Sequence, residues 1–223
     1  MTPIPWLEQT GYHFPDVETA LTDPDGLLAA SQQLYPELII DAYRQGVFPW
    51  YTAGQPVLWW SPDPRCVFFP KDFHVSRSLQ RTLKRNIFTI TTNTVFREIM
   101  LACAAPRKNA RKNETGTWIT AEMLKNYCRL HEMGFAHSIE CWHQDKLAGG
   151  LYGLKIGNIF FGESMFSKVN DASKVALHYV CTQIRPALLD AQVKSDHLMR
   201  MGATLIPRKR FTRILQMNLA EYS

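Results

Sequence analysis

The proline- and tryptophan-rich stretch from Gly46 to Arg65 constrains the fold of this chain more than any other feature. It reads GVFPWYTAGQPVLWWSPDPR and contains prolines at positions 49, 56, 62 and 64. Each proline lacks a backbone donor and disfavours the helical conformation in the residue before it. Long regular structure is therefore excluded here. We expect a boundary near residues 61–64, between a small N-terminal domain of residues 1–63 and a larger domain of residues 64–223.

The composition predicts a globular protein. The chain has 223 residues, of which 46% are hydrophobic, and a formal net charge of +5. The five cysteines are odd in number and form no C-x-x-C pair, so we expect free thiols, a reducing compartment and no metal site. The N-terminus lacks the basic and apolar regions of a signal peptide, and no run of about 18 apolar residues predicts a membrane span. We therefore expect a cytoplasmic protein.

Helical and extended patterns alternate along the chain. We expect helices at 36–45, 75–85, 95–103, 120–133 and 171–184, a short one ending at Gly202, and one after Pro207. Strands are expected at 66–69, 88–91, 188–193 and near Leu205, with a hairpin of 135–142 and 146–154 and a short third strand at 159–161. The candidate N-caps of the helix at 171–184 are Asp171 and Ser173. This order predicts an α+β domain with a mixed, largely antiparallel sheet.

Four cations are spaced for one face of the helix expected at 75–85. They stand at i, i+4, i+7 and i+8, with no Asp or Glu in the same segment: Arg77, Arg81, Lys84 and Arg85. A solvated helix face and a phosphate-binding face are both compatible with this spacing. RNA bound here should show strong salt dependence and little sequence preference, because phosphate contacts carry no base information.

The carboxylate of Glu163 lacks an obvious partner. It follows the apolar run 159–161 in the motif GESMFS, and no Lys or Arg adjoins it before Lys168. Carboxylates are rarely buried unless they are paired. One interpretation is that a distant Arg or Lys pairs with Glu163 in the fold.

Familiar catalytic signatures are missing from the sequence. The seven histidines form no H-E-x-x-H motif or Cys/His ligand array, and neither a G-x-S-x-G elbow nor a P-loop occurs. Covalent and metal-dependent catalysis therefore have little support.

Nine longer motifs occur in one order between about residues 11 and 213. They are GLLA at 26–29, GVFPWY at 46–51, LWWSPDPR at 58–65, HVSRSL at 74–79, TWIT at 117–120, LHEMGFAHSIECW at 130–142, GGLYG at 149–153, GESMFS at 162–167 and DASKVAL at 171–177. Together they resemble the leucyl/phenylalanyl-tRNA–protein transferases of bacteria.

This resemblance implies a small N-terminal domain followed by a domain similar to the GNAT acyltransferase fold. It also implies transfer of Leu or Phe, and also Met, from aminoacyl-tRNA to the N-terminal Arg or Lys of a protein, which marks that protein for degradation through the N-degron pathway. The implied partners are aminoacyl-tRNA and proteins with N-terminal Arg or Lys, with no membrane partner. We expect no metal or other cofactor, and a monomer.

The resemblance also carries site residues onto this chain. It places the tRNA-binding cluster on the four cations named above, and the catalytic pair on Asp190 and Gln192 in LLDAQ. The implied substrate-binding residues are Trp50, Trp118, Tyr127, Leu151, Glu163, Met165, Leu177 and Val180.

Each implied role is a physical expectation. Gln192 should accept a hydrogen bond from the attacking amine, and Asp190 should orient Gln192. Aromatic rings at 50, 118 and 127 should stack on or cap the terminal adenine, although most such rings simply pack. The apolar residues should form the pocket for the transferred amino acid. Glu163 then meets a cation that arrives with a substrate.

Three departures from the family pattern affect details of the site. Ala191 stands where the family often has Cys, and Val180 and Ile184 stand where some members carry aromatic residues.

Two other functions stay open on sequence alone. An acyl-CoA-dependent acetyltransferase would place a glycine-rich turn before the helix at 171, and SKVND has no glycine. A non-catalytic RNA-binding protein would need only the basic helix face.

Overall fold

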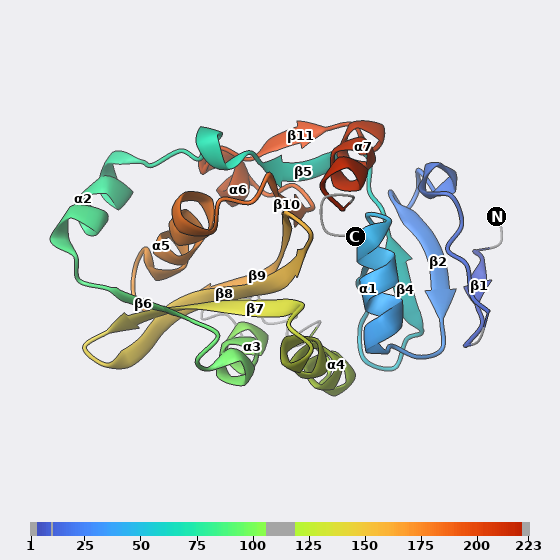
Figure 1. The fold of residues 1–223 in the computed structure, drawn as a ribbon, viewed down its shortest axis with the longest axis horizontal. Coiled ribbons are helices and arrows are strands. Elements are labelled where there is room, and N and C mark those ends of the chain that lie inside the picture. The colour runs from blue at the N-terminus through green and yellow to red at the C-terminus, as the bar shows by residue number, and fades with distance from the viewer. Residues whose placement is uncertain (1–3, 10, 106–118, 220–223) are drawn as a thin grey trace.

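A computed structural model describes residues 4–9, 11–105 and 119–219, which form two β-sheets and their covering helices (Figure 1). The first sheet has the order β1-β2-β4-β3. Its strands are β1 (Trp6–Leu7), β2 (Leu27–Ser31), β3 (Phe48–Pro49) and β4 (Val57–Trp60). Helix α1 (Pro36–Arg44) connects β2 to β3 and begins with proline at its first position.

The second sheet has seven strands in the order β11-β5-β10-β9-β8-β7-β6. They are β5 (Arg65–Phe68), β6 (Thr89–Thr92), β7 (Ala136–His143), β8 (Lys146–Ile156), β9 (Ile159–Ser167), β10 (Leu188–Gln192) and β11 (Thr204–Ile206). Neighbouring strands are antiparallel except for β9 and β10, which are parallel. The expected α+β class with a mixed, largely antiparallel sheet is confirmed.

Helices cover both faces of the second sheet (Figure 1). On one face lie α3 (Phe96–Ala104) and α4 (Ala121–Glu132), and on the other lies α5 (Ala172–Tyr179), which continues as a π-helical turn at Val180–Ile184. The remaining helices are α2 (Arg77–Arg85), α6 (Asp196–Arg200), α7 (Arg208–Leu219) and 3-10 turns at Val17–Thr19 and Pro70–Asp72. No helix among the described residues is long and apolar enough to cross a membrane.

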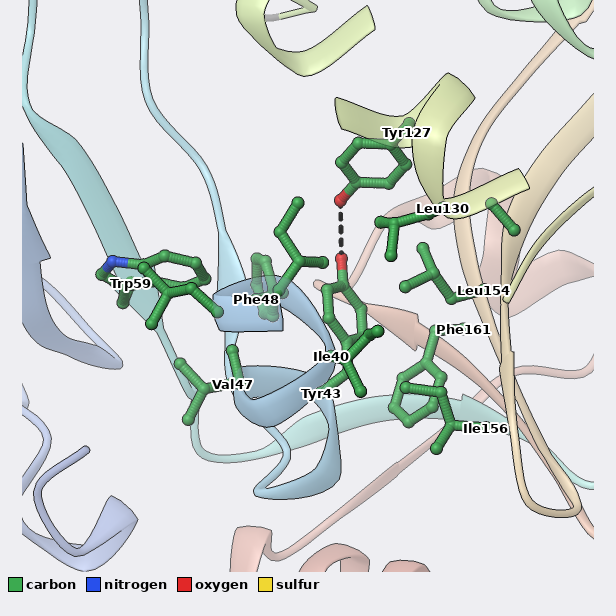
Figure 2. Close-up of a cluster of buried hydrophobic side chains, with 14 of the residues drawn as sticks. Ile40, Tyr43, Val47, Phe48, Trp59, Tyr127, Leu130, Leu154, Ile156 and Phe161 are labelled. Carbon is green, nitrogen blue, oxygen red and sulfur yellow. Dashed lines mark hydrogen bonds between the residues drawn. The ribbon is translucent and has the colours of Figure 1, made fainter. Parts of the chain in front are cut away.

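One hydrophobic cluster joins the two sheets. It contains Trp59 from the first sheet, Phe161 from the second and Tyr43 from α1, all fully buried (Figure 2). The fully buried Phe211 of α7 belongs to the same cluster. A second cluster lies on the other face of the larger sheet, under α5. The strands of the first sheet precede residue 61 and those of the second follow residue 64, but the division of the chain at residues 63 and 64 stays a prediction.

Element types in the larger sheet and its helices agree with expectation, and the differences there have tertiary causes. None of the four strands of the first sheet was expected. Ser76 caps α2 and Thr120 caps α4 through hydrogen bonds from backbone N–H groups to the side-chain hydroxyls. Strand β9 does not end at residue 161 but continues to Ser167, because β8 is long enough to pair with it throughout.

Of the two predicted caps of α5, Asp171 stands at the N-cap position and Ser173 does not. Asp171 adopts a left-handed conformation and makes no capping bond, while Ser173 donates its backbone N–H to the Ser167 hydroxyl.

Gly46 ends α1 at a position that no other residue fits. Its φ is +78°, and a Cβ atom built there would lie 2.9 Å from a ring carbon of Phe211. Both the left-handed backbone and the close approach of α7 therefore require glycine.

We predict that Gly46→Ala lowers the free energy of unfolding by about 2–4 kcal/mol, the sum of backbone strain and overpacking. Gly54→Ala is the matched control, because Gly54 has a φ of +86° and a Cβ atom added to it would meet no other atom within 4 Å. It should cost only about 1–2 kcal/mol. Urea denaturation of both variants checks this, and equal losses would contradict the packing contribution.

Candidate active site

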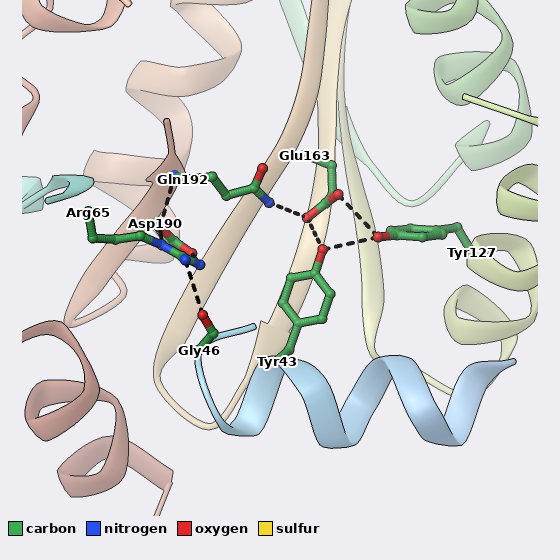
Figure 3. A network of polar contacts seen from close by, with 7 residues as sticks. All are labelled: Tyr43, Gly46, Arg65, Tyr127, Glu163, Asp190 and Gln192. Atoms are coloured by element: carbon green, nitrogen blue, oxygen red, sulfur yellow. Dashed lines mark hydrogen bonds and ion pairs between the residues drawn. The ribbon is translucent and has the colours of Figure 1, made fainter. Parts of the chain in front are cut away.

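A fully buried ion pair joins β5 to β10 at the centre of the molecule (Figure 3). Arg65 donates to Asp190 twice, from Nε to Oδ1 at 2.9 Å and from Nη2 to Oδ2 at 2.7 Å. Its Nη1 donates to the carbonyl oxygen of Gly46 at 3.0 Å. The guanidinium lies 4.8 Å from the ring centre of Phe48 and 4.6 Å from that of Phe211. This bidentate, ring-flanked geometry compensates for the cost of burying two charges.

Two β-bulges lie next to this ion pair. In β10, Asp190 pairs with Val67 and Gln192 with Cys66, which leaves Ala191 as the extra residue. In β9, Gly162 and Ser164 pair with consecutive residues of β8, which leaves Glu163 as the extra residue. Bulges redirect side chains and are common beside active sites. Here they bring Gln192 and Glu163 together from neighbouring strands.

The half-buried Glu163 carboxylate is held by three hydrogen bonds (Figure 3). Tyr43 donates to Oε1 at 2.6 Å, Gln192 Nε2 donates to Oε1 at 2.9 Å, and Tyr127 donates to Oε2 at 3.1 Å. Among the described residues no Lys or Arg forms an ion pair with Glu163. The interpretation that a distant cation of the chain neutralises it is therefore wrong for this part of the protein. Phenols and an amide replace the expected cation.

The oxygen contacts favour a protonated Glu163. The two phenol oxygens lie 3.0 Å apart, so three oxygen–oxygen contacts join Tyr43, Tyr127 and Glu163. While both phenols donate to an ionised carboxylate, the contact between the phenol oxygens carries no proton. A carboxyl protonated on Oε2 donates to Tyr127 instead and lets Tyr127 donate to Tyr43, so all three contacts are filled. Burial raises the pKa of Glu163 to about 7, and the nearby charge of Asp190 acts in the same direction against the hydrogen bonds. Burial also keeps both phenols protonated by raising the pKa of each well above 10.

The side-chain amide of Gln192 has one defined orientation. Because Oε1 of Glu163 acts as an acceptor, Gln192 must present Nε2 to it, and the Oε1 of Gln192 points away (Figure 3). The backbone N–H of Gln192 donates to Asp190 Oδ1 at 2.9 Å, and its φ is +61°. Asp190 thus contacts the main chain of Gln192, not its side chain. Since Asp190 is fully buried, it cannot touch a substrate.

The four expected pocket residues lie on the other face of the sheet. Leu151, Leu177 and Val180 are at most 4% exposed and belong to the second hydrophobic cluster. Met165 packs against the same cluster and is half-buried. The Glu163 carboxylate faces Tyr43 and Tyr127 of the first cluster instead. The expected single lining of Glu163 and these apolar residues is therefore not formed in this conformation.

The three aromatic residues expected to contact the adenine differ in exposure. Trp50 is 46% exposed and lies at the end of β3, where its ring meets Trp60 at a centroid distance of 6.1 Å. Tyr127 is fully buried, with its ring edge against Tyr152, so its ring is not accessible to an adenine in this conformation and the stacking role stays a prediction. Trp118 lies outside the described residues.

The four cations of α2 form one exposed helix face, as expected. All of Arg77, Arg81, Lys84 and Arg85 are exposed, and Leu79 on the opposite side is buried. None of the four forms an ion pair with a described acidic residue, so their charge is available to an anionic partner.

Two residues of the site were missed on sequence alone. Arg65 stands in an otherwise apolar strand, as does Asp190, and that shared feature was the signal for a buried pair. Tyr43 lies on the apolar face of α1 and reads as a plain core residue. In the described part of the chain, no three His, Cys, Asp or Glu side chains gather to hold a metal ion.

The raised pKa of Glu163 predicts a pH dependence of stability. Between about pH 4.5 and 7 the folded state keeps a proton that the unfolded state has lost, so stability falls as pH rises. From pH 5 to pH 8 the wild type should lose about 1–3 kcal/mol of unfolding free energy relative to Glu163→Gln. Urea denaturation at several pH values checks this. The exposed Glu132 on α4 supplies the control, because Glu132→Gln should leave the profile unchanged. If the stabilities of wild type and Glu163→Gln change with pH in the same way, the prediction is contradicted.

Comparisons with known proteins agree with the motif pattern. The family model described as leucyl/phenylalanyl-tRNA protein transferase matches residues 67–216, and the model of its N-terminal domain matches residues 32–63. The chain is 50% identical over 215 residues to the leucyl/phenylalanyl-tRNA–protein transferase of Cellvibrio japonicus, covering 95% of this chain and 90% of the relative. It is 53% identical over 209 residues to that of Nitrosomonas europaea, covering 92% and 87%.

Similar solved structures are more distant. They include a GCN5-related N-acetyltransferase from Kribbella flavida, with a TM-score of 0.38 and 11% identity over 78% of this chain and 61% of that one. Another is L-PGS from Bacillus licheniformis, with a TM-score of 0.39 and 10% identity over 76% and 54%. The sequence matches decide the assignment: this chain belongs to the leucyl/phenylalanyl-tRNA protein transferase family.

Proposed function

We propose that the bulged segment around Gln192 and Glu163 is where this chain joins its two substrates. As a family member the chain is a transferase, which moves Leu or Phe from aminoacyl-tRNA to the N-terminal Arg or Lys of a protein. The main support for placing the reaction here is the fixed amide of Gln192. Its Oε1 receives no hydrogen bond from the described residues and is therefore free to accept one from a substrate.

The reaction is the aminolysis of an ester. The α-amine of the acceptor protein attacks the ester carbonyl carbon, a C–N bond forms, and the C–O bond to the tRNA ribose breaks. One proton leaves the nitrogen and one is gained by the ribose oxygen. An α-amine has a pKa of about 7.7–8, so a sizeable fraction is already neutral at neutral pH. Positioning can therefore supply much of the acceleration.

Gln192 is the candidate for positioning the amine. Its Oε1 accepts a hydrogen bond from the attacking nitrogen while Nε2 stays on Glu163. An amide is too weak a base to take the proton outright, so the role is orientation. Asp190 and Arg65 act one step further away, by holding the backbone of Gln192 in its left-handed conformation.

Glu163 is suited to a cation brought by the substrate. Its carboxyl is neutral or ionised according to small changes in its surroundings near pH 7. An ammonium or guanidinium beside it would favour ionisation. The acceptor side chain and the α-amino group of the aminoacyl ester are both compatible with this role.

The other parts of the donor have candidate contacts of their own. Exposed Trp50 offers a ring for the terminal adenine, and the basic face of α2 offers charge to the tRNA backbone. For the amino acid to enter beside Leu151, Leu177, Val180 and Met165, the second cluster must open. Donor Met, a monomeric state and a cytoplasmic location remain parts of this proposal.

A transfer assay tests the proposal directly. Wild-type protein incubated with Phe-tRNA and a peptide beginning with Arg should add one Phe to the peptide, measured by mass spectrometry. Gln192→Ala should lower turnover at least about 100-fold and leave tRNA affinity nearly unchanged. Gln45→Ala removes an exposed glutamine at the end of α1 and should behave as wild type. Unchanged turnover in Gln192→Ala would exclude its role, and absence of any transfer by wild type would leave only RNA binding.

The buried ion pair allows positioning to be separated from stability. Arg65→Met leaves the buried Asp190 charge without a partner and should lower the free energy of unfolding by about 3–5 kcal/mol. The double variant Arg65→Met with Asp190→Leu removes both charges and should recover most of this loss. It also removes the acceptor of the Gln192 N–H, so kcat should stay low while KM for the tRNA donor changes little. If turnover returns together with stability, Asp190 has only a structural role.

A further inference from the structure

A cavity of about 180 Å³ lies between α2, α5 and β6, apart from the Gln192 site. Its volume is below the roughly 300–1,000 Å³ of sites for drug-sized ligands. It has room for one small ring system. Gln183 lies in its wall within the π-helical turn that extends α5, and such turns are frequent at functional sites.

The cavity wall is uncharged and combines aromatic and polar side chains with the aliphatic ones of Leu83, Ile87, Ile90 and Val175. Aromatic rings come from Phe88, Tyr179 and His178, and amides come from Asn86 and Gln183. No Asp, Glu, Lys or Arg of the described chain lines it. The imidazole of His178 also counts as uncharged, because burial lowers its pKa.

Three polar side chains of the cavity make no hydrogen bond within the described fold, although the ring of His178 packs against Phe73 at a centroid distance of 5.9 Å and both amide side chains are exposed. The side chains of Asn86, His178 and Gln183 form no hydrogen bond with another described residue, although Thr82 beside them donates to Asp171. Amides that lack a partner are suited to the edge of a hydrogen-bonding ring, and neighbouring aromatic faces are suited to stacking on it.

The residues next to the cavity, unlike its wall, are positively charged. Arg81 directly precedes Thr82 and Arg85 directly precedes Asn86, and both arginines are exposed and unpaired among the described residues. A ligand that suits both places has a flat, neutral, hydrogen-bonding part and an adjoining anion. A nucleotide has this chemistry.

We propose that this cavity receives the base of one unpaired tRNA nucleotide, whose phosphate lies against Arg81 and Arg85. The inference rests on the proposed function, because the tRNA donor is its ligand. The cavity would bind the tRNA through an uncharged contact, in addition to the charged contacts of the basic α2 face. A free nucleoside monophosphate would satisfy the same chemistry, so the experiment must separate the two sources.

Binding of uncharged tRNA at several salt concentrations tests the cavity. The double variant Asn86→Gly with Gln183→Ala removes both amides, and glycine keeps the left-handed backbone that Asn86 adopts. We expect Kd to rise about tenfold at every salt concentration, with an unchanged salt slope. Arg85→Gln should instead lower the slope by about one. The matched control Gln80→Ala, an exposed residue of α2 outside the cavity, should leave both quantities unchanged.

A truncated donor distinguishes loss of the cavity contact from general damage to the enzyme. Phenylalanyl-adenosine has no nucleotide beyond the ester-bearing one, so its transfer to an Arg-peptide should be unchanged in the double variant. An unchanged tRNA Kd, or an equal loss with the truncated donor, would overturn the proposal. AMP should compete with tRNA for the wild-type cavity; AMP that binds there without displacing tRNA would assign the cavity to a free nucleotide and also overturn it. Normal tRNA binding without any transfer would instead contradict the proposed function.

Discussion

The fold depends on the buried contact between Arg65 and Asp190. Two charges removed from water are tolerated only with excellent geometry, and each has its hydrogen-bonding capacity met from a different part of the chain. The guanidinium binds β10 through the carboxylate, the end of α1 through Gly46, and α7 through the ring of Phe211. The same carboxylate also fixes Gln192. Placement of Gln192 therefore depends on this interaction, and removal of either partner alone leaves a buried charge unpaired.

Glu163 shows the opposite arrangement, a carboxylate that the described chain leaves without a cation. Its hydroxyl and amide partners hold it in place without neutralising it. Burying a carboxyl group without a charge partner is costly, and natural proteins keep such groups mainly at functional sites. The second unusual feature at this place, the positive φ of Gln192, has the same meaning. The strain and the carboxylate without a cation coincide where the two bulges meet.

Sequence patterns predicted the fold class, the strands of the larger sheet and the main helices, because periodicity and proline positions are local properties. They did not predict the four strands of the first sheet. Membership of Glu163, Asp190 and Gln192 in the site came from the motif resemblance. Their geometry could not be predicted, because a bulge depends on the register between two strands. For the same reason strand β9 was cut short at residue 161. Tyr43 was missed, since a phenol on an apolar helix face looks like core until its partner strand is known.

The distribution of charge fits the two substrates of the family. A tRNA is a polyanion and an N-terminal Arg or Lys is a cation, so one surface cannot attract both. The exposed cations of α2 stand on one element, whereas Glu163 lies in the central sheet with its carboxylate half-buried. An ionised Glu163 disfavours the approach of phosphates, whereas the ammonium of the aminoacyl ester favours its ionisation. Under the proposed placement, the donor backbone lies on α2 and its ester end at Gln192, so the two charged substrates approach separate parts of the molecule.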